Sequence, residues 1–246
     1  SGESGVPTAF VPWDNRGMCG RVVQAQSPGA YAEYFGVDLV ETEALRMSYN
    51  VAPTDRVYAV ADFEGTRRLG TFKWGLLPWF AKDRKMAARA INARVETAAE
   101  KPTFRDSFAR RRCLIPADGF YEWERKVKGK LPHYIYAADG SPLPLAGLWS
   151  SWKDPETGER ITTCTILTGP PTDVVAPLHD RMPVVIPRAQ WDAWLDPDER
   201  DPERVAALLK AAASPDLAEH PVSTLVNKVQ NNVPDLIVPL ETPAAD

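Results

Sequence analysis

The stretch VYAVADFEGTRRLGTFKW, residues 57–74, decides the fold of this chain. Val57 to Phe63 and Gly70 to Trp74 are rich in the β-branched and aromatic residues that strands favour, and Glu64-Gly65 is typical of a tight turn. The stretch therefore predicts two strands joined by a turn. Further runs of this kind follow at residues 113–115, 134–138, 145–149 and 161–167.

Helical patterns are fewer than strand patterns and do not alternate with them. Ser27-Pro28 is typical of a helix N-cap followed by proline in the first turn. The expected helices cover residues 27–35, 188–195 and 202–212, and a last strand is expected within residues 224–240. Strands without regularly intervening helices favour a single, mostly antiparallel α+β domain over a doubly wound parallel sheet.

The composition of the 246 residues excludes several classes of protein. No apolar run approaches the roughly 20 residues of a membrane span. The first 18 residues lack the basic start and apolar core of a secretory signal. Cys19, Cys113 and Cys164 are too few and too widely spaced for a disulfide framework or a zinc site. We therefore expect a cytoplasmic monomer without membrane anchor, metal or cofactor.

The net charge of -4 hides an uneven charge distribution. Residues 82–112 contain ten Lys/Arg against four Asp/Glu, whereas residues 196–246 contain four against ten. A basic patch on an acidic protein can still bind phosphates, because local charge sets the contacts. The alternative for Arg110-Arg111-Arg112 is a solvated helix end.

Cys19 follows Met18 directly. Removal of a methionine would give Cys19 a free α-amine beside its thiol, but 17 residues precede Met18. Residues 1–18 are a leader or cloning-derived extension, a propeptide cut before Cys19, or a segment that keeps the cysteine blocked. We favour a misassigned start with cloning residues, because the segment is unpatterned, and expect the domain over residues 19–240.

Two further segments contain candidate acid–base groups. Glu122 lies among aromatic residues in Gly119-Phe120-Tyr121-Glu122-Trp123, and such surroundings raise a carboxyl pKa towards neutrality. The alternative is a strand carboxylate that faces water. Strand alternation puts Tyr121 and Trp123 on one face, and Phe120, Glu122 and Glu124 on the other. Because this second face is mixed, periodicity leaves both alternatives open.

His179 lies between a proline-rich loop and Asp180-Arg181. It is a catalytic candidate because histidine titrates near neutral pH, although a single histidine is more often structural. Cys19 could be a thiol nucleophile paired with His179, or a small buried apolar residue.

Two segments could bind DNA. Trp74 and Trp79 surround a Gly/Pro turn, where a tryptophan either fills the end of a barrel or offers a platform on which a base stacks. Asn92-Ala93-Arg94 offers an amide and a guanidinium suited to phosphate. An asparagine or arginine in a loop is, however, usually structural or solvated.

Eight motifs in one order resemble those of the SRAP family (SOS response-associated peptidase). They are Met18-Cys19-Gly20-Arg21, Tyr49-Asn50-Val51-Ala52-Pro53-Thr54, Trp74-Gly75-Leu76-Leu77-Pro78, Asn92-Ala93-Arg94-Val95-Glu96, Arg112-Cys113-Leu114-Ile115-Pro116, Gly119-Phe120-Tyr121-Glu122-Trp123, Ala146-Gly147-Leu148-Trp149 and His179-Asp180-Arg181-Met182-Pro183. The resemblance implies an α+β fold around an antiparallel, barrel-like sheet, with peripheral short helices and a basic DNA groove.

The resemblance also implies a function: an abasic-site sensor in single-stranded DNA that traps the lesion covalently, nucleoid-associated when bound. It assigns catalytic roles to Cys19, Asn92, Glu122 and His179, and DNA contacts to Arg21, Asn50, Pro53, Trp74, Arg94 and Arg181. A terminal amine attacks the open-chain aldehyde, and the thiol closes a thiazolidine ring. The alternatives are a thiol peptidase that cuts its own leader before Cys19, and a non-covalent module that binds single-stranded DNA.

Overall fold

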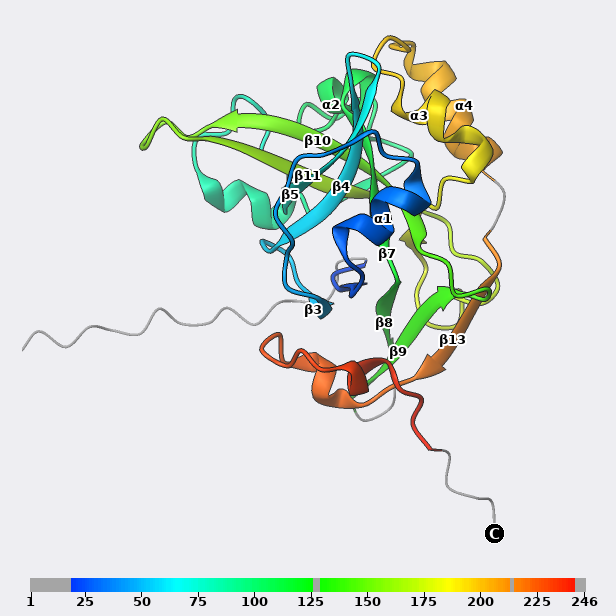
Figure 1. Cartoon of the computed structure of the whole chain (residues 1–246). Helices are drawn as coiled ribbons and strands as arrows, with labels where there is room; N and C mark the ends of the chain where they lie inside the picture. The colour runs from blue at the N-terminus through cyan, green and yellow to red at the C-terminus, as the bar shows by residue number, and fades with distance from the viewer. Residues whose placement is uncertain (1–18, 126–128, 213–214, 242–246) are drawn as a thin grey trace, which may run out of the picture.

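Five strands close into a barrel in the computed structural model, which describes residues 19–125, 129–212 and 215–241 (Figure 1). The barrel strands are β4 (Arg56–Phe63), β5 (Thr66–Trp74), β7 (Arg112–Ala117), β10 (Leu143–Lys153) and β11 (Arg160–Gly169). They pair in the order β11-β10-β7-β4-β5, and a parallel pairing of Cys164 with Trp74 joins β5 back to β11. Closure removes the free edges of the sheet.

The β4–β5 hairpin forms as its sequence predicts. Glu64 and Gly65 both have positive φ, 54° and 76°. This conformation matches the primed turns whose twist suits a two-residue hairpin loop. The register runs from Phe63 opposite Thr66 to Arg56 opposite Lys73.

A second sheet packs beside the barrel and carries the candidate site. Its strand order is β13-β9-β8-β1-β3. The bounds are β1 (Val22–Gln24), β3 (Ser48–Val51), β8 (Gly119–Arg125), β9 (Lys130–Ala137) and β13 (Leu217–Pro221). Only Asp118 separates β7 from β8, so the chain passes from the barrel to the second sheet in one step. One hydrophobic core, which includes Cys19, Phe120 and Cys164, is shared by both sheets.

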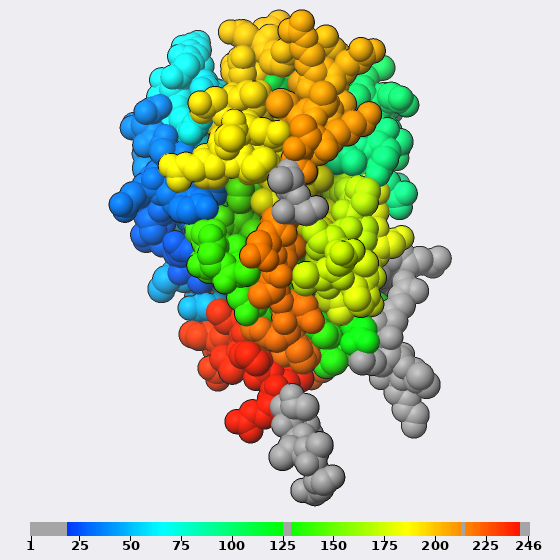
Figure 2. Space-filling view, turned by 90° about the vertical axis from the view of Figure 1, so that its right-hand side faces the viewer, coloured from blue at the N-terminus to red at the C-terminus, as the bar shows by residue number. Residues whose placement is uncertain are grey.

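Short helices lie around the sheets. The α-helices are α1 (Pro28–Phe35), α2 (Arg105–Arg110), α3 (Trp191–Leu195) and α4 (Pro202–Ala211). The 3₁₀ helices are η1 (Arg84–Arg89), η2 (Arg188–Gln190), η3 (Thr224–Asn227) and η4 (Pro234–Ile237). The remaining strands are β2 (Leu39–Val40), β6 (Asn92–Arg94) and β12 (Met182–Pro183). Figure 2 shows α4 and β13 along one face, above the C-terminal segment. In α1, the Ser27 hydroxyl accepts a hydrogen bond from the Ala30 N–H at 3.1 Å, as its cap pattern predicts.

The structure confirms the antiparallel α+β fold with a barrel and corrects its last element. The prediction of a strand within residues 224–240 is wrong, because that segment forms η3 and η4. Pro234 starts η4. The edge of β9 is already paired with β13, which precedes this segment in the chain. Residues 1–18, expected to be a leader, lie outside the described residues. No helix in the described part of the chain is long and apolar enough to cross a bilayer.

Candidate active site

Cys19 and Glu122 lie together at the junction of the two sheets. Cys19 precedes β1, is 0% exposed, and belongs to the core cluster that contains Trp74 and Ile91. Its backbone N–H donates to the Glu122 carboxylate. Burial and the Glu122 charge raise the pKa of the Cys19 thiol well above its usual value. The nitrogen and the sulfur of Cys19 are therefore both influenced by one carboxyl group.

Glu122 points into the core because of strand alternation in β8. Tyr121 and Trp123 pack on the opposite face, as predicted. Burial, with a smaller contribution from the Asp180 charge, raises the pKa of Glu122 to about 8, although the N–H groups of Cys19 and Trp123 offset part of the rise. Glu122 Oε1 is buried and has no hydrogen-bond partner among the described residues.

The loop of residues 170–181 carries His179 and Asp180. His179 Nδ1 accepts a hydrogen bond from the Arg181 N–H at 3.0 Å, and Asp180 Oδ1 lies 3.1 Å from the same nitrogen. The Asp180 charge contributes to the raised pKa of Glu122 and so links this loop to Glu122. A direct role for His179 stays a prediction.

Asn92 begins β6, which pairs in parallel with β11. Its Nδ2 donates to the Ile166 carbonyl at 3.4 Å, whereas its Oδ1 is buried without a partner in the described part of the chain. The preceding Ile91 packs in the same core cluster as Cys19. Asn92 therefore presents an unused acceptor, which suits a donor such as an amine.

Arg21 and Asn50 tie the second sheet to the C-terminal segment. Arg21 Nη1 donates to Asn50 Oδ1 at 2.8 Å and to the Val226 carbonyl at 2.7 Å. Asn50 Nδ2 donates to the carbonyls of Val226, Lys228 and Asn231 at 2.9–3.2 Å. Pro53 follows β3 and is half-buried. The contacts of Arg21 and Asn50 are structural, and DNA binding by these three residues stays a prediction.

Arg94 and Arg181 differ in their surroundings. Arg181 forms a two-pronged ion pair with Glu96, at 2.6 and 2.8 Å, and donates to the Thr168 carbonyl. Arg94 is exposed, and its charge helps to lower the Glu96 pKa. Arg94 is therefore the better placed of the two to meet a phosphate from solvent.

Trp74 is buried in this structure, and its predicted contact with DNA stays a prediction. It ends β5, is 0% exposed, and its Nε1 donates to the Ile91 carbonyl at 2.9 Å. The exposed aromatic pair is Trp79 and Phe80, which lie edge to face with centroids 5.6 Å apart. Trp79 is 72% exposed. The position of Trp79 beside a Gly/Pro turn was the sequence signal for this surface.

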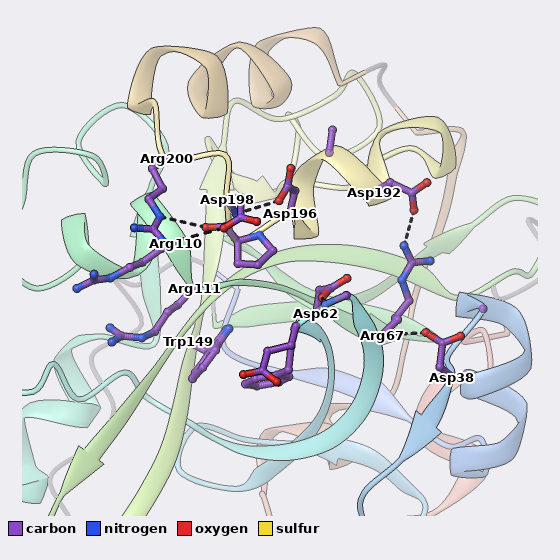
Figure 3. A pocket seen from close by; sticks show the side chains of 16 residues that line it. Asp38, Asp62, Arg67, Arg110, Arg111, Trp149, Asp192, Asp196, Asp198 and Arg200 are labelled. Atoms are coloured by element: carbon purple, nitrogen blue, oxygen red, sulfur yellow. Dashed lines mark hydrogen bonds and ion pairs between the residues drawn. The ribbon is translucent and has the colours of Figure 1, made fainter.

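A cavity of about 1030 Å³ lies elsewhere (Figure 3). None of the predicted site residues lines it. Its walls hold charges that are already paired, such as Arg67 with Asp192 at 2.5 Å, and the Arg111 guanidinium stacks on Trp149. Among the described residues, no group of three or more His, Cys, Asp or Glu could hold a metal ion.

Comparison with known proteins assigns the chain to a family. The family model described as SOS response associated peptidase (SRAP) matches residues 18–229. The chain belongs to the SRAP family. An SRAP relative, the abasic site processing protein YoqW of Bacillus subtilis, is 40% identical over 222 residues, which cover 89% of this chain and 99% of the relative.

Two more distant proteins extend the likeness. The abasic site processing protein HMCES of Gallus gallus is 32% identical, over 80% of this SRAP chain and 67% of the relative. A crystal structure of a protein from Bacteroides thetaiotaomicron superposes with a TM-score of 0.81 at 24% identity, covering 91% of this chain and 100% of that one. This last match supports the fold alone.

Proposed function

We propose that the chain processes abasic sites in single-stranded DNA and joins them covalently to Cys19. The observation that carries the proposal is the Cys19 nitrogen, whose N–H donates to the buried carboxylate of Glu122. Family membership and the names of the relatives support the choice of lesion. The reaction requires that Cys19 be the first residue, so that this nitrogen is an amine.

The reaction balances without a cofactor. The amine of Cys19 attacks the open-chain aldehyde of the abasic sugar, and the resulting carbinolamine loses water to give an imine. The thiol sulfur then adds to the imine carbon, and the S–H proton moves to the nitrogen. One water is released, and a thiazolidine ring remains. A terminal amine has a pKa of about 7.7 to 8.0, so part of it is unprotonated at neutral pH.

Glu122 is suited to the proton transfers of this sequence. Its pKa of about 8 lets it hold a proton near neutral pH and still release it. It would protonate the leaving hydroxyl of the carbinolamine and accept a proton during ring closure. Asn92 Oδ1 would accept a hydrogen bond from the amine, and His179 would act on the sugar. Fixing amine and aldehyde in contact supplies much of the rate.

Stacking and phosphate contacts would account for binding of single-stranded DNA that does not depend on its base sequence. Trp79 and Phe80 are exposed next to η1, whose exposed Lys85 and Arg89 supply positive charge. Base stacking on an aromatic side chain and cations along the backbone are the usual means of binding single strands. We infer that the DNA passes over this surface and Arg94 to reach Cys19.

The test compares proteins that differ only at their first residue. Protein beginning at Cys19 is incubated with a labelled single-stranded oligonucleotide that carries one abasic site. We expect a heat-stable adduct whose mass equals protein plus DNA minus one water. Full-length chain that keeps residues 1–18 should bind the oligonucleotide without forming the adduct.

Substitutions at Cys19 sharpen the test. Cys19→Ala keeps the amine, so borohydride should trap its imine, but no heat-stable ring should form without the reductant. Binding measured on an unmodified oligonucleotide should be unchanged. If the protein beginning at Cys19 binds DNA but gives neither adduct nor trapped imine, covalent processing is refuted and non-covalent binding is the function.

The thiol-peptidase alternative has less support. A thiol nucleophile needs a lowered pKa to be a thiolate, whereas burial and Glu122 raise the pKa of Cys19. Intact-mass measurement of the full-length chain over time tests it directly. Loss of residues 1–18 in the wild type, but not in Cys19→Ala, would revive self-processing.

A further inference from the structure

One ion pair crosses the end of β11 and joins two segments of the candidate site. At this end, Thr168 pairs with Arg94 of β6 on one side and with Pro183 of β12 on the other. β6 begins at Asn92, and the loop that carries His179 leads into β12. Asn92 and His179, both predicted to be catalytic, therefore come from segments that flank the same strand.

The pair consists of Arg181, the residue before β12, and Glu96, which follows β6. Arg181 Nη1 and Nη2 lie 2.6 and 2.8 Å from the two Glu96 carboxylate oxygens, and Nη2 also donates to the Thr168 carbonyl at 2.5 Å. The same carbonyl accepts a hydrogen bond from the Val95 N–H at 3.0 Å. The Arg181 side chain therefore reaches across β11 and binds the segment on its far side.

The environment of Arg181 makes this contact costly to lose. Its side chain is 11% exposed, and its Nε is buried without a partner among the described residues. Glu96 supplies the carboxylate that balances this charge, and the hydrogen bond from Arg181 lowers the pKa of Glu96. A buried charge that loses its partner is strongly destabilising, so without Glu96 the guanidinium would move towards water.

Arg181 also contacts His179, two residues earlier in the chain. The Arg181 N–H donates to His179 Nδ1 at 3.0 Å, so the main chain that Glu96 holds in place also orients the imidazole ring. Val175 packs in the core and anchors the middle of the loop. The backbone hydrogen bonds of residues 172–179 stay within the loop and set its shape. Arg181, in contrast, fixes the end of the loop relative to β6.

We propose that Glu96 is a positioning residue for the reaction: it holds Arg181, and through Arg181 it fixes the position of His179 relative to Asn92 on β6. This role rests on the reaction steps proposed for His179 and Asn92. A shift of about 1 Å between groups that act on one substrate can cost about a hundredfold in rate. Loss of Glu96 should therefore slow the reaction although no group that acts on the sugar is removed.

The experiment measures the rate of adduct formation. Protein beginning at Cys19 is held at several concentrations in excess of a labelled oligonucleotide with one abasic site. Glu96→Gln keeps the shape of the side chain and removes its charge. We expect its maximal rate to fall about tenfold or more, whereas the protein concentration at half this rate should rise by no more than about twofold.

Two matched variants separate positioning from general effects. In the His179→Ala background, Glu96→Gln should cause less than about a twofold further loss of rate, because the ring that it positions is gone. Glu41→Gln removes a comparable ion pair, since Glu41 is 43% exposed and lies 2.7 Å from Arg68. Neither residue of this second pair belongs to the candidate site, so Glu41→Gln should react at the wild-type rate.

Amide hydrogen exchange without DNA gives an independent reading of the loop. In Glu96→Gln, exchange of residues 178–182 should become faster than in the wild type, because the Arg181 anchor is lost. In Glu41→Gln, exchange of these residues should equal that of the wild type.

Three results would overturn this role: an unchanged maximal rate in Glu96→Gln, unchanged exchange of residues 178–182, or losses in Glu96→Gln and His179→Ala that multiply in the double variant. If the wild type itself forms no adduct, the proposed function is refuted instead. The exchange measurement then still shows whether Glu96 holds the loop.

Discussion

At the scale of single residues, Glu122 shows how burial changes a carboxyl group. Its pKa rises from 4.5 to about 8, mainly through the loss of water. In the unfolded chain it ionises near its ordinary value, so between the two pKa values the native state binds more protons. The free energy of unfolding therefore falls as pH rises through this window.

Glu122→Gln should remove this loss of stability. We expect the substitution to have little effect at pH 4.5 and to stabilise the protein by roughly 3 to 5 kcal/mol at pH 8.5, relative to wild type. Urea unfolding at several pH values measures the difference. Glu100→Gln, in an exposed turn, is the control and should show no such trend. Parallel pH profiles for Glu122→Gln and wild type would contradict the raised pKa.

Two tryptophans five residues apart have opposite roles. Trp79→Ala should weaken binding of a single-stranded oligonucleotide by about 1–3 kcal/mol, because an exposed stacking surface is lost. Its effect on the urea midpoint should be small. Trp74→Ala should cost about 3–5 kcal/mol of stability, because it empties part of the core. Fluorescence anisotropy and urea unfolding measure the pair. Unchanged affinity in Trp79→Ala would remove this residue from the DNA surface.

At the scale of elements, Asn50 joins β3 to the C-terminal segment through three backbone carbonyls. Asn50→Ala should destabilise the protein by about 1–3 kcal/mol, because buried carbonyls lose their donor. Amide hydrogen exchange in residues 225–238 should become faster. Lys228→Ala is the matched control, since only its backbone carbonyl takes part. Unchanged exchange in Asn50→Ala would show that other contacts hold the segment.

At the scale of the whole molecule, the distribution of charge decides DNA binding. The net charge of -4 repels DNA phosphates, yet residues 82–112 contain an excess of basic groups. We expect the affinity for a single-stranded oligonucleotide to fall about tenfold or more between 50 and 200 mM salt. Arg94→Glu should flatten this dependence, whereas Lys210→Glu on α4 should not. Binding that ignores salt would exclude phosphate contacts on this surface.

The sequence by itself determined the local elements. Alternation in β8 put Tyr121 and Trp123 on the face opposite Glu122, the Glu64-Gly65 turn set the β4–β5 hairpin, and Ser27 capped α1. These features depend on neighbouring residues only, so propensity and period suffice to predict them.

Only the tertiary structure decided how distant segments meet. Strand pairing between residues far apart placed His133 opposite Glu122 and its ring against the Glu219 carboxylate, a grouping that no local pattern signals. Long-range packing buried Trp74 and left Trp79 in solvent, although both belong to one turn-rich stretch. The segment after β13 formed 3₁₀ turns because Asn50 and Arg21 engage its carbonyls in place of a strand partner. Burial and pairing depend on the whole chain, and they set the chemistry of the site.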